Sequence, residues 1–352
     1  FNIEQDEGHR ILGYVVPDGY SGVPTISLLS EGEVVLTCAA NENRQALVDA
    51  GRHETGRCGF NIGPELAPGL ADLKDLSIVD AETDLLIYRR AQANRIPRKI
   101  LRLETHLFPL WRFDQGLREK VQYFQKGLEL FGRETVTQMF LLTGVDSVYL
   151  SGRIFYRSFA SCIENGFEMA LVLQDPYEEL AERLLVLALQ GDHAATYLGE
   201  RDAVRFAPAI AYAASLPMAN ERQLRRALMD MPTRVAALLA NPLVRQLTTA
   251  NPNEMPASGA VGAALDVLAS CVVVALRNDP AYFTQAMADW LGLDPKDLTL
   301  TPTFPRITEL AQRLKESRTV DHLLERDLEV YECMRGAYGL SLIHISEPTR
   351  LG

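Results

Sequence analysis

The chain has 352 residues, of which 47% are hydrophobic and 23% are charged, which is the usual composition of a globular protein. This length allows a sizeable core and two domains. The net charge of −11 argues against a nonspecific nucleic-acid binder, because neutralising phosphates requires clustered lysines and arginines. It leaves room for a local basic pocket that holds one phosphate or sulfate group.

The five cysteines are scattered and form no C-x-x-C pair, so neither a zinc motif nor a redox motif is expected. No apolar run is long enough to span a bilayer. Together these features predict reduced thiols, a cytoplasmic location and no integral membrane segment. No signal peptide is visible, but the chain begins with Phe1 rather than Met, which leaves open a lost targeting segment.

Residues 8–90 predict an all-β region, which we interpret as a small β-sandwich domain over 1–90. Turn residues separate five short apolar or β-branched runs: Leu12–Val16, Thr25–Leu29, Val34–Cys38, Leu76–Val79 and Leu85–Tyr88. The sequence Ser30-Glu31-Gly32 predicts a hairpin turn, and residues 41–51 predict one short helix.

The stretch 44–60 resembles a module found beside bacterial glycan-modifying enzymes. Within it, Gly59-Phe60 predicts a backbone turn followed by a core aromatic residue. Three side chains form a candidate anion site, with an ordinary solvated loop as the alternative: Arg52, His53 and Arg57.

Residues 91–98 (AQANRIPR) are polar and predict a linker to a second domain over 99–339. In that domain apolar runs and helical patterns alternate. The patterns predict, in order, a strand at 99–107, a helix at 116–130, a strand at 145–150 and a helix at 153–164. Three successive strand–helix steps imply a parallel sheet with right-handed crossovers.

The most informative stretch is 167–190, where the short apolar run Met169–Leu173 predicts a strand buried on both faces. Asp175 is then a natural N-cap, and Pro176 occupies the first helical position, where a missing N–H costs nothing. In open parallel sheets, ligands bind at the ends of such strands.

The remaining sequence predicts more helices and one further strand. Residues 192–257 are mostly helical and broken by prolines, and this region resembles the variable helical region that covers the sheet in sulfotransferases. A helix at 259–269, a strand at 271–276, a helix from Asp279-Pro280 to Gly292 and a last helix at 320–339 follow. The predicted fold class is therefore α/β, with helices on both faces of a parallel sheet and a helical cover.

Three short segments give residues 99–339 a resemblance to bacterial sulfotransferases. They are Gln174-Asp175-Pro176 between strand and helix, Asn241-Pro242-x-x-Arg245-x-Leu247, and Arg326-Asp327-Leu328-x-x-Tyr331 in the last helix. The resemblance implies a P-loop-type α/β domain and 3′-phosphoadenosine-5′-phosphosulfate as cofactor. With the N-terminal module, it implies a glycan or lipid-linked sugar hydroxyl as acceptor.

The resemblance also implies where the donor would bind. The phosphosulfate cradle falls at 104–116, where bulky side chains stand instead of small ones, and His106 and Arg112 are the candidate catalytic groups there. Gln174 stands where the family has an arginine for the 3′-phosphate, and Glu182 stands where it has a serine. Glutamate repels a phosphate.

A further candidate anion site is Ser151-Gly152-Arg153, which is expected at a helix N-terminus. Backbone N–H groups and a guanidinium at such a position bind anions. The alternative is a helix cap with Arg153 paired to a carboxylate. For Glu325-Arg326-Asp327 the pattern indicates a solvated helix face or an internal salt bridge.

Three functional hypotheses follow. The first is a divergent sulfotransferase that uses His106, Arg112 and Arg153 around the transferred group. The second is a degenerate sulfotransferase-like domain that binds a glycan or a protein, and the missing cradle and Gln174 favour it. The third is a glycosyltransferase, which would need an Asp-x-Asp metal motif that the sequence lacks.

The last residues require a separate interpretation. Leu340–Arg350 (LSLIHISEPTR) resembles the translation of a sequencing-library adaptor. We therefore expect 340–352 to be an artefact that lies outside the fold, in a chain assembled from environmental reads.

Overall fold

The computed structural model describes residues 1–16, 21–93, 95–142, 144–189 and 197–346. The chain divides into two compact units. The first comprises Phe1–Lys99, Leu117–Gln125 and Phe131–Leu150, and the second comprises Ile100–Gly116, Lys126–Leu130 and Ser151–Gly352. The domain boundaries expected from the sequence, 1–90, 91–98 and 99–339, stay a prediction.

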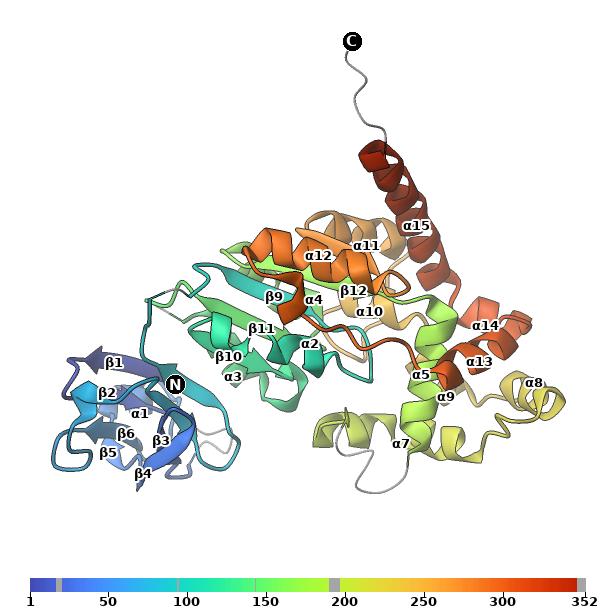
Figure 1. Cartoon of the computed structure of the whole chain (residues 1–352). Helices are drawn as coiled ribbons and strands as arrows, with labels where there is room; N and C mark the ends of the chain where they lie inside the picture. The colour runs from blue at the N-terminus through green and yellow to red at the C-terminus, as the bar shows by residue number, and fades with distance from the viewer. Residues whose placement is uncertain (17–20, 94, 143, 190–196, 347–352) are drawn as a thin grey trace, which may run out of the picture. The chain divides into compact units, whose positions relative to one another are not determined.

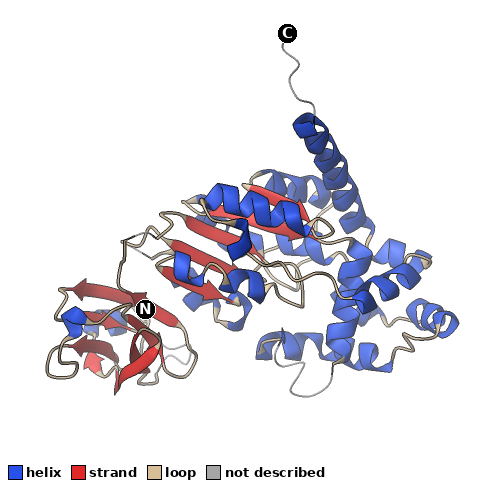
Figure 2. Ribbon diagram, in the orientation of Figure 1, coloured by secondary structure: helices blue, strands red, loops and turns tan. Residues whose placement is uncertain are grey.

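The N-terminal part of the first unit contains two four-stranded antiparallel sheets (Figures 1 and 2). One has the order β1-β2-β6-β5 and the other the order β4-β3-β7-β8. The strands are β1 (Asn2–Asp6), β2 (Ile11–Tyr14), β3 (Thr25–Ser30), β4 (Glu33–Ala39), β5 (Glu42–Asn43), β6 (Arg57–Ile62), β7 (Ser77–Asp80) and β8 (Leu86–Arg89).

Asp6 joins the two sheets through hydrogen bonds. It accepts from the Tyr88 hydroxyl at 2.7 Å and from Nε of Arg90 at 2.9 Å. The predicted hairpin turn is confirmed, because β3 and β4 pair around Glu31 and Gly32, both with positive φ. The prediction of a turn at Gly59-Phe60 is wrong, since both residues lie in β6, although Phe60 is buried in the core as expected.

The second sheet system is a five-stranded parallel sheet in the order β10-β11-β9-β12-β13. Its strands are β9 (Lys99–Leu103), β10 (Tyr123–Lys126), β11 (Val148–Gly152), β12 (Glu168–Leu173) and β13 (Val273–Leu276). Strand β12 pairs with β9 on one side, Leu171 opposite Leu103, and with β13 on the other, Leu173 opposite Leu276. The β12 core residues are fully buried, which confirms the strand predicted from their apolar run.

Helix α1 lies between β5 and β6, and the other helices precede, connect or follow the strands of the parallel sheet along the chain (Figure 1). They are α1 (Gln45–Asp49), α2 (Trp111–Gln115), α3 (Arg133–Phe140), α4 (Tyr156–Glu164), α5 (Pro176–Ala188), α7 (Glu200–Ser215), α8 (Glu221–Met229), α9 (Thr233–Leu239), α10 (Pro242–Thr248), α11 (Ala260–Ala269), α12 (Pro280–Leu291), α13 (Pro305–Leu314), α14 (Arg318–Leu323) and α15 (Glu325–Ser346). Short 3₁₀ helices are η1 (Leu70–Asp72), η2 (Arg118–Lys120), η3 (Leu128–Leu130) and η4 (Pro295–Asp297).

Two helix starts confirm the capping predictions. The Asp175 carboxylate accepts from the backbone N–H of Tyr177 at 2.9 Å, with Pro176 at the first position of α5. Asp279 caps α12 in the same way, and Gly292 ends that helix in the left-handed conformation. The tail expected to be artefact continues the backbone of α15 to Ser346, and residues 347–352 lie outside the described residues.

Two helix predictions are wrong. The last helix, expected at 320–339, is interrupted at Leu324, where α14 ends before α15 begins. Residues 116–130 do not form a helix but fold as η2, strand β10 and η3. Gly127 has a φ of +70°, which ends any regular helix at that point. Leu117 and Val121 are nevertheless buried in the core, although neither residue lies in a helix. In the described part of the chain, no helix combines the length and the apolar character needed to cross a bilayer.

Candidate functional site at the carboxyl ends of the parallel strands

Polar side chains follow four neighbouring strands of the parallel sheet. Glu104 and His106 follow β9, Arg153 follows β11, Gln174 follows β12 and Arg277 follows β13. Because the carboxyl ends of parallel strands meet at one edge, these residues converge there. Most are buried: Glu104 and His106 are 1% exposed and Gln174 is 3% exposed. Buried polar groups at this edge mark it as the candidate site.

A buried network of charged and polar side chains lies next to the site, at the ends of β9 and β11. The Arg102 guanidinium binds Asp114 in a bidentate manner, at 2.7 Å from Nε and 2.8 Å from Nη2. Nη2 also donates to Glu104 at 2.9 Å, and the Ser151 hydroxyl donates to Asp114 at 2.9 Å. Such fork-shaped, charge-assisted pairs are strong and geometrically specific. The network fixes the ends of β9 and β11 relative to each other.

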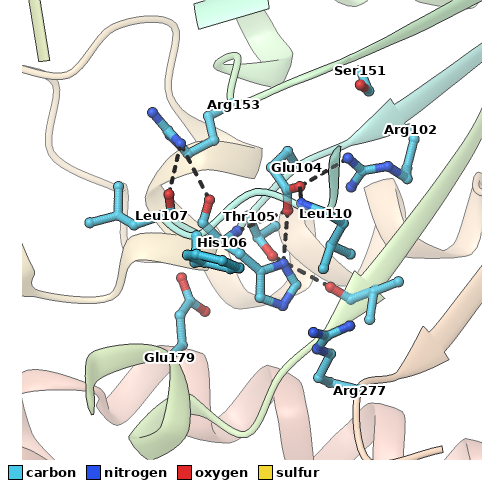
Figure 3. Close-up of polar contacts among 12 residues, drawn as sticks. Arg102, Glu104, Thr105, His106, Leu107, Leu110, Ser151, Arg153, Glu179 and Arg277 are labelled. Carbon is cyan, nitrogen blue, oxygen red and sulfur yellow. Dashed lines mark hydrogen bonds and ion pairs between the residues drawn. The ribbon is translucent and has the colours of Figure 1, made fainter. Parts of the chain in front are cut away.

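Glu104 organises the loop that follows β9 (Figure 3). Its carboxylate accepts from the backbone N–H of Leu110 at 2.8 Å, from the backbone N–H of His106 at 3.1 Å and from Nδ1 of His106 at 2.8 Å. Burial acts to raise the pKa of Glu104, but Arg102 and His106 outweigh it and hold this pKa well below its usual range. Glu104 is therefore a charged acceptor at the centre of the loop.

A second carboxylate, that of Glu182, binds another backbone N–H group of this loop. Glu182 of α5 is buried and accepts from the backbone N–H of Phe108 at 3.0 Å. Burial raises the pKa of Glu182 above its usual value, because no arginine is bound to it as Arg102 is to Glu104. Three N–H groups of the 104–110 loop thus already bind protein carboxylates.

His106 has one nitrogen that is not used by the fold. Nδ1 contacts Glu104, whereas Nε2 is buried and has no hydrogen-bond partner among the described residues. Arg277 carries a comparable buried nitrogen, Nη1, while its Nη2 donates to the carbonyl of Thr301. Burial lowers the pKa of Arg277, although Glu182 and Glu104 oppose this effect. Arg112, the other predicted catalytic residue, is instead exposed on α2.

The segment Ser151-Gly152-Arg153 is not at a helix N-terminus, so that prediction is wrong. Ser151 and Gly152 belong to β11, and α4 begins only at Tyr156. Gly152 is required for packing, because a Cβ there would lie 2.4 Å from the backbone nitrogen of Leu128. The segment cannot present a helix-end row of N–H groups to an anion.

Arg153 is paired with carboxylates, as the alternative interpretation predicted. Its guanidinium lies 3.2 Å from Glu129 and 3.2 Å from Asp202. It also donates to the carbonyl of Leu107 at 3.3 Å (Figure 3). Arg153 therefore ties the 104–110 loop to its surroundings.

The candidate anion site in the first unit is not assembled. His53 is 1% exposed, its Nδ1 accepts from the backbone N–H of Gly56 at 2.9 Å, and its Nε2 contacts the carbonyl of Gly22 at 3.1 Å. Arg57 is exposed. His53 is a structural residue that holds its own turn.

Sequence reasoning missed the buried arginines of the second unit. Arg183 is 6% exposed and pairs with Glu179 at 2.7 Å, one helical turn earlier. Arg245 is 4% exposed on the short helix α10. The available signal was the presence of arginine within otherwise apolar helical segments.

Asp327 corrects another expectation. It is 1% exposed rather than part of a solvated face, and it accepts from the backbone N–H groups of Leu243 at 3.0 Å and Val244 at 2.9 Å. Asp327 therefore caps the start of α10 from α15. Burial raises its pKa to about 7, with Glu179 acting in the same direction.

We predict that Asp327 makes stability depend on pH. The folded protein keeps a proton on Asp327 between about pH 4 and pH 7, where the unfolded chain has lost it. The free energy of unfolding should therefore fall as the pH rises through this window, by about 1.4 kcal/mol for each pKa unit of the shift. Urea titrations at pH 5 and pH 8 measure this, and Asp327→Asn should show a smaller difference. An equal difference in both proteins would contradict the assignment.

The described residues contain no group of three or more His, Cys, Asp or Glu side chains that would hold a metal ion. Comparisons with protein-family models, with curated proteins and with solved structures find no match to this chain.

Proposed function

We propose that the second unit is a sulfotransferase-like domain without donor chemistry, which acts as a binding module for a glycan or a protein partner. The observation that carries this proposal is the occupation of the 104–110 loop by Glu104 and Glu182. The resemblance requires this loop to offer backbone N–H groups to the phosphosulfate of the donor. Here those groups bind carboxylates that belong to the chain itself.

The residues at the site therefore do not fit 3′-phosphoadenosine-5′-phosphosulfate in the family's manner. A phosphate approaching the loop would meet the charged carboxylate of Glu104 at close range. Gln174 supplies no cation for the 3′-phosphate, and Arg153 is already paired with Glu129 and Asp202. We derive no transfer step through this donor.

A second candidate function is an active, divergent sulfotransferase, and the free Nε2 of His106 favours it. A carboxylate that orients one imidazole nitrogen while the other is unbonded is the arrangement of a general base. In that function His106 would take the proton of a glycan hydroxyl. Because His106 is 1% exposed, the acceptor would reach it only after the covering segments move.

The two functions differ in how the chain should bind nucleotide. We expect 3′-phosphoadenosine-5′-phosphate to bind the full chain no more than a few-fold tighter than inorganic phosphate, since three N–H groups of the 104–110 loop already bind carboxylates and Gln174 supplies no cation. Isothermal titration calorimetry with each ligand measures the ratio. A hundredfold preference for the nucleotide, about 2.7 kcal/mol, would overturn the binding-module proposal. A sulfuryl-transfer assay with His106→Asn as control would then follow.

We also infer the finer architecture and the location. The two antiparallel sheets are taken to form a sandwich, supported by the hydrogen bonds of Asp6 to Tyr88 and Arg90. Helices on both faces of the parallel sheet and a helical cover over 192–257 remain part of the proposal, with 190–196 outside the described residues. A cytoplasmic location is supported by the five free cysteines.

A further inference from the structure

A cavity of about 60 Å³ lies beside the 104–110 loop, within the second unit. About 10–15 Å³ of such space holds one water, so this cavity has room for a small tetrahedral ion and is too small for a nucleotide. Four arginines from the chain after β11 and from helices α5, α7 and α10 line it: Arg153, Arg183, Arg205 and Arg245. Asp202 is the one carboxylate among the lining residues.

Two of the four arginines are neutralised by the protein. Arg153 binds Glu129 and Asp202, as described above. The Arg183 guanidinium lies 2.7 Å from the Glu179 carboxylate and donates to the carbonyl of Thr105 at 2.9 Å. These pairs give the cavity a fixed wall.

Arg205 contacts two aromatic rings closely and its carboxylate partner only at long range. Its guanidinium lies 4.8 Å from the ring centre of Phe206 and 5.6 Å from that of Phe155. The distance to the shared carboxylate of Asp202 is 3.9 Å. Burial lowers the pKa of Arg205 to about 10, and Arg245, Arg183 and Arg153 act in the same direction. Arg205 thus remains a cation at neutral pH, but one in unfavourable surroundings.

Arg245 is the least compensated charge in the cavity. It is 4% exposed, and its Nε is buried without a hydrogen-bond partner among the residues that the structure describes. Burial lowers its pKa and Arg183 adds to the effect, while the charge of Asp327 opposes it. Asp327 is turned toward the N–H groups of Leu243 and Val244 and does not pair with it. A buried cation without a partner is costly unless an anion joins it.

We infer that this cavity binds a tetrahedral oxyanion, the sulfate or phosphate group of an ester, through Arg245 and Arg205. The fork of each guanidinium matches the oxygens of such a group, and planar arginine is suited to this recognition. The four guanidinium groups outnumber the carboxylates that they bind, which are Glu129, Glu179 and Asp202. A bound anion would balance the excess.

This inference deepens the proposed binding function by naming the class of ligand, and it rests on that function only for where the ligand comes from. A sulfated or phosphorylated glycan or protein would present the group. The loop carboxylates Glu104 and Glu182 are not among the residues that line the cavity.

The test compares sodium sulfate, sodium phosphate and sodium chloride at equal ionic strength. Thermal unfolding of the full chain is followed by tryptophan fluorescence, with Arg245→Met as the variant and Arg226→Met as the control, since Arg226 is 84% exposed on α8. We expect sulfate and phosphate to raise the Tm of the wild type more than chloride does. The dissociation constant should rise at least tenfold in Arg245→Met and stay unchanged in Arg226→Met.

A purely structural role for Arg245 predicts that Arg245→Met lowers the Tm in chloride, whereas the proposed anion site predicts that it raises this Tm. If Arg245 waits for an anion, Arg245→Met should raise the Tm in chloride by about 2 °C or more, because an unpaired buried charge is replaced by an apolar side chain of similar length. A lower Tm in chloride, or equal effects of the three salts on the wild type, would overturn the inference.

The two proposals fail in different ways. Sulfate binding that depends on Arg245, without a preference for 3′-phosphoadenosine-5′-phosphate, supports both. Tight nucleotide binding that survives Arg245→Met overturns the binding-module function. The Tm values in sulfate, phosphate and chloride then decide by themselves whether the oxyanion site exists. Tight nucleotide binding that is lost in Arg245→Met overturns the inference in its present form, because the cavity alone has no room for the adenosine.

Discussion

Asp114→Ala is expected to lower the free energy of unfolding of the second unit by about 3–5 kcal/mol, because it leaves a buried guanidinium without its bidentate partner. Asp114 is fully buried and Arg102 is 1% exposed, so water cannot replace the lost carboxylate. Ser151 also loses its acceptor. Both tryptophans of the chain, Trp111 and Trp290, belong to the second unit, so their fluorescence in urea reports its unfolding.

The control for this prediction is Asp289→Ala, on the exposed side of α12, which should change the free energy of unfolding by less than about 0.5 kcal/mol. The double variant Arg102→Met/Asp114→Leu should not recover the loss, since it also removes the cation that binds the buried Glu104 carboxylate. A loss below about 1 kcal/mol in Asp114→Ala would show that Glu104 alone satisfies Arg102.

Glu104→Gln is expected to destabilise the second unit by a similar amount at pH 7, about 3–5 kcal/mol. The glutamine amide would place a donor group where Leu110, His106 and Arg102 all donate to a carboxylate. An unsatisfied or opposed donor in a buried site costs its full desolvation. Glu309→Gln, at an exposed position of α13, is the matched control and should have little effect.

The pH dependence of this effect has a definite sign. The pKa of Glu104 is lowered in the folded state, so its carboxylate stabilises the fold above the unfolded value of about 4.3. That contribution is lost as the pH falls below about 4. The difference between wild type and Glu104→Gln, measured by urea unfolding, should therefore shrink from pH 7 to pH 3. If this difference in the free energy of unfolding is the same at pH 7 and pH 3, Glu104 stabilises the fold through packing and not through its charge.

The sequence predicts the parts of this fold that local chemistry decides. Met169–Leu173 is predictable as a buried strand because a five-residue apolar run between turn residues has the length of a strand and is too short for a typical buried helix. Asp175 and Asp279 are caps because a carboxylate before proline has few other uses. The spacing of apolar residues within 116–130 predicts a helix that does not form. Buried residues can recur at helical intervals in a segment that is not helical. There Gly127 and pairing within the sheet decide the outcome.

The candidate site was harder to predict than the fold. Sequence reasoning found His106 and Arg153 but not their partners, because Glu104, Glu129 and Asp202 are distant or unremarkable in the sequence. Which cation meets which carboxylate depends on the tertiary packing of several helices. For the same reason the sequence shows Arg245 as part of a short motif but does not show that its Nε lacks a partner.

The carboxylates inside the 104–110 loop have an evolutionary consequence. Removing Glu182 alone would leave the N–H of Phe108 without an acceptor, at a cost of about 1–3 kcal/mol, before any phosphate could take its place. Removing Glu104 would also disturb Arg102. In evolution these N–H groups would therefore become available to a phosphate only by several substitutions at once, because each single substitution leaves a buried donor or cation without its partner.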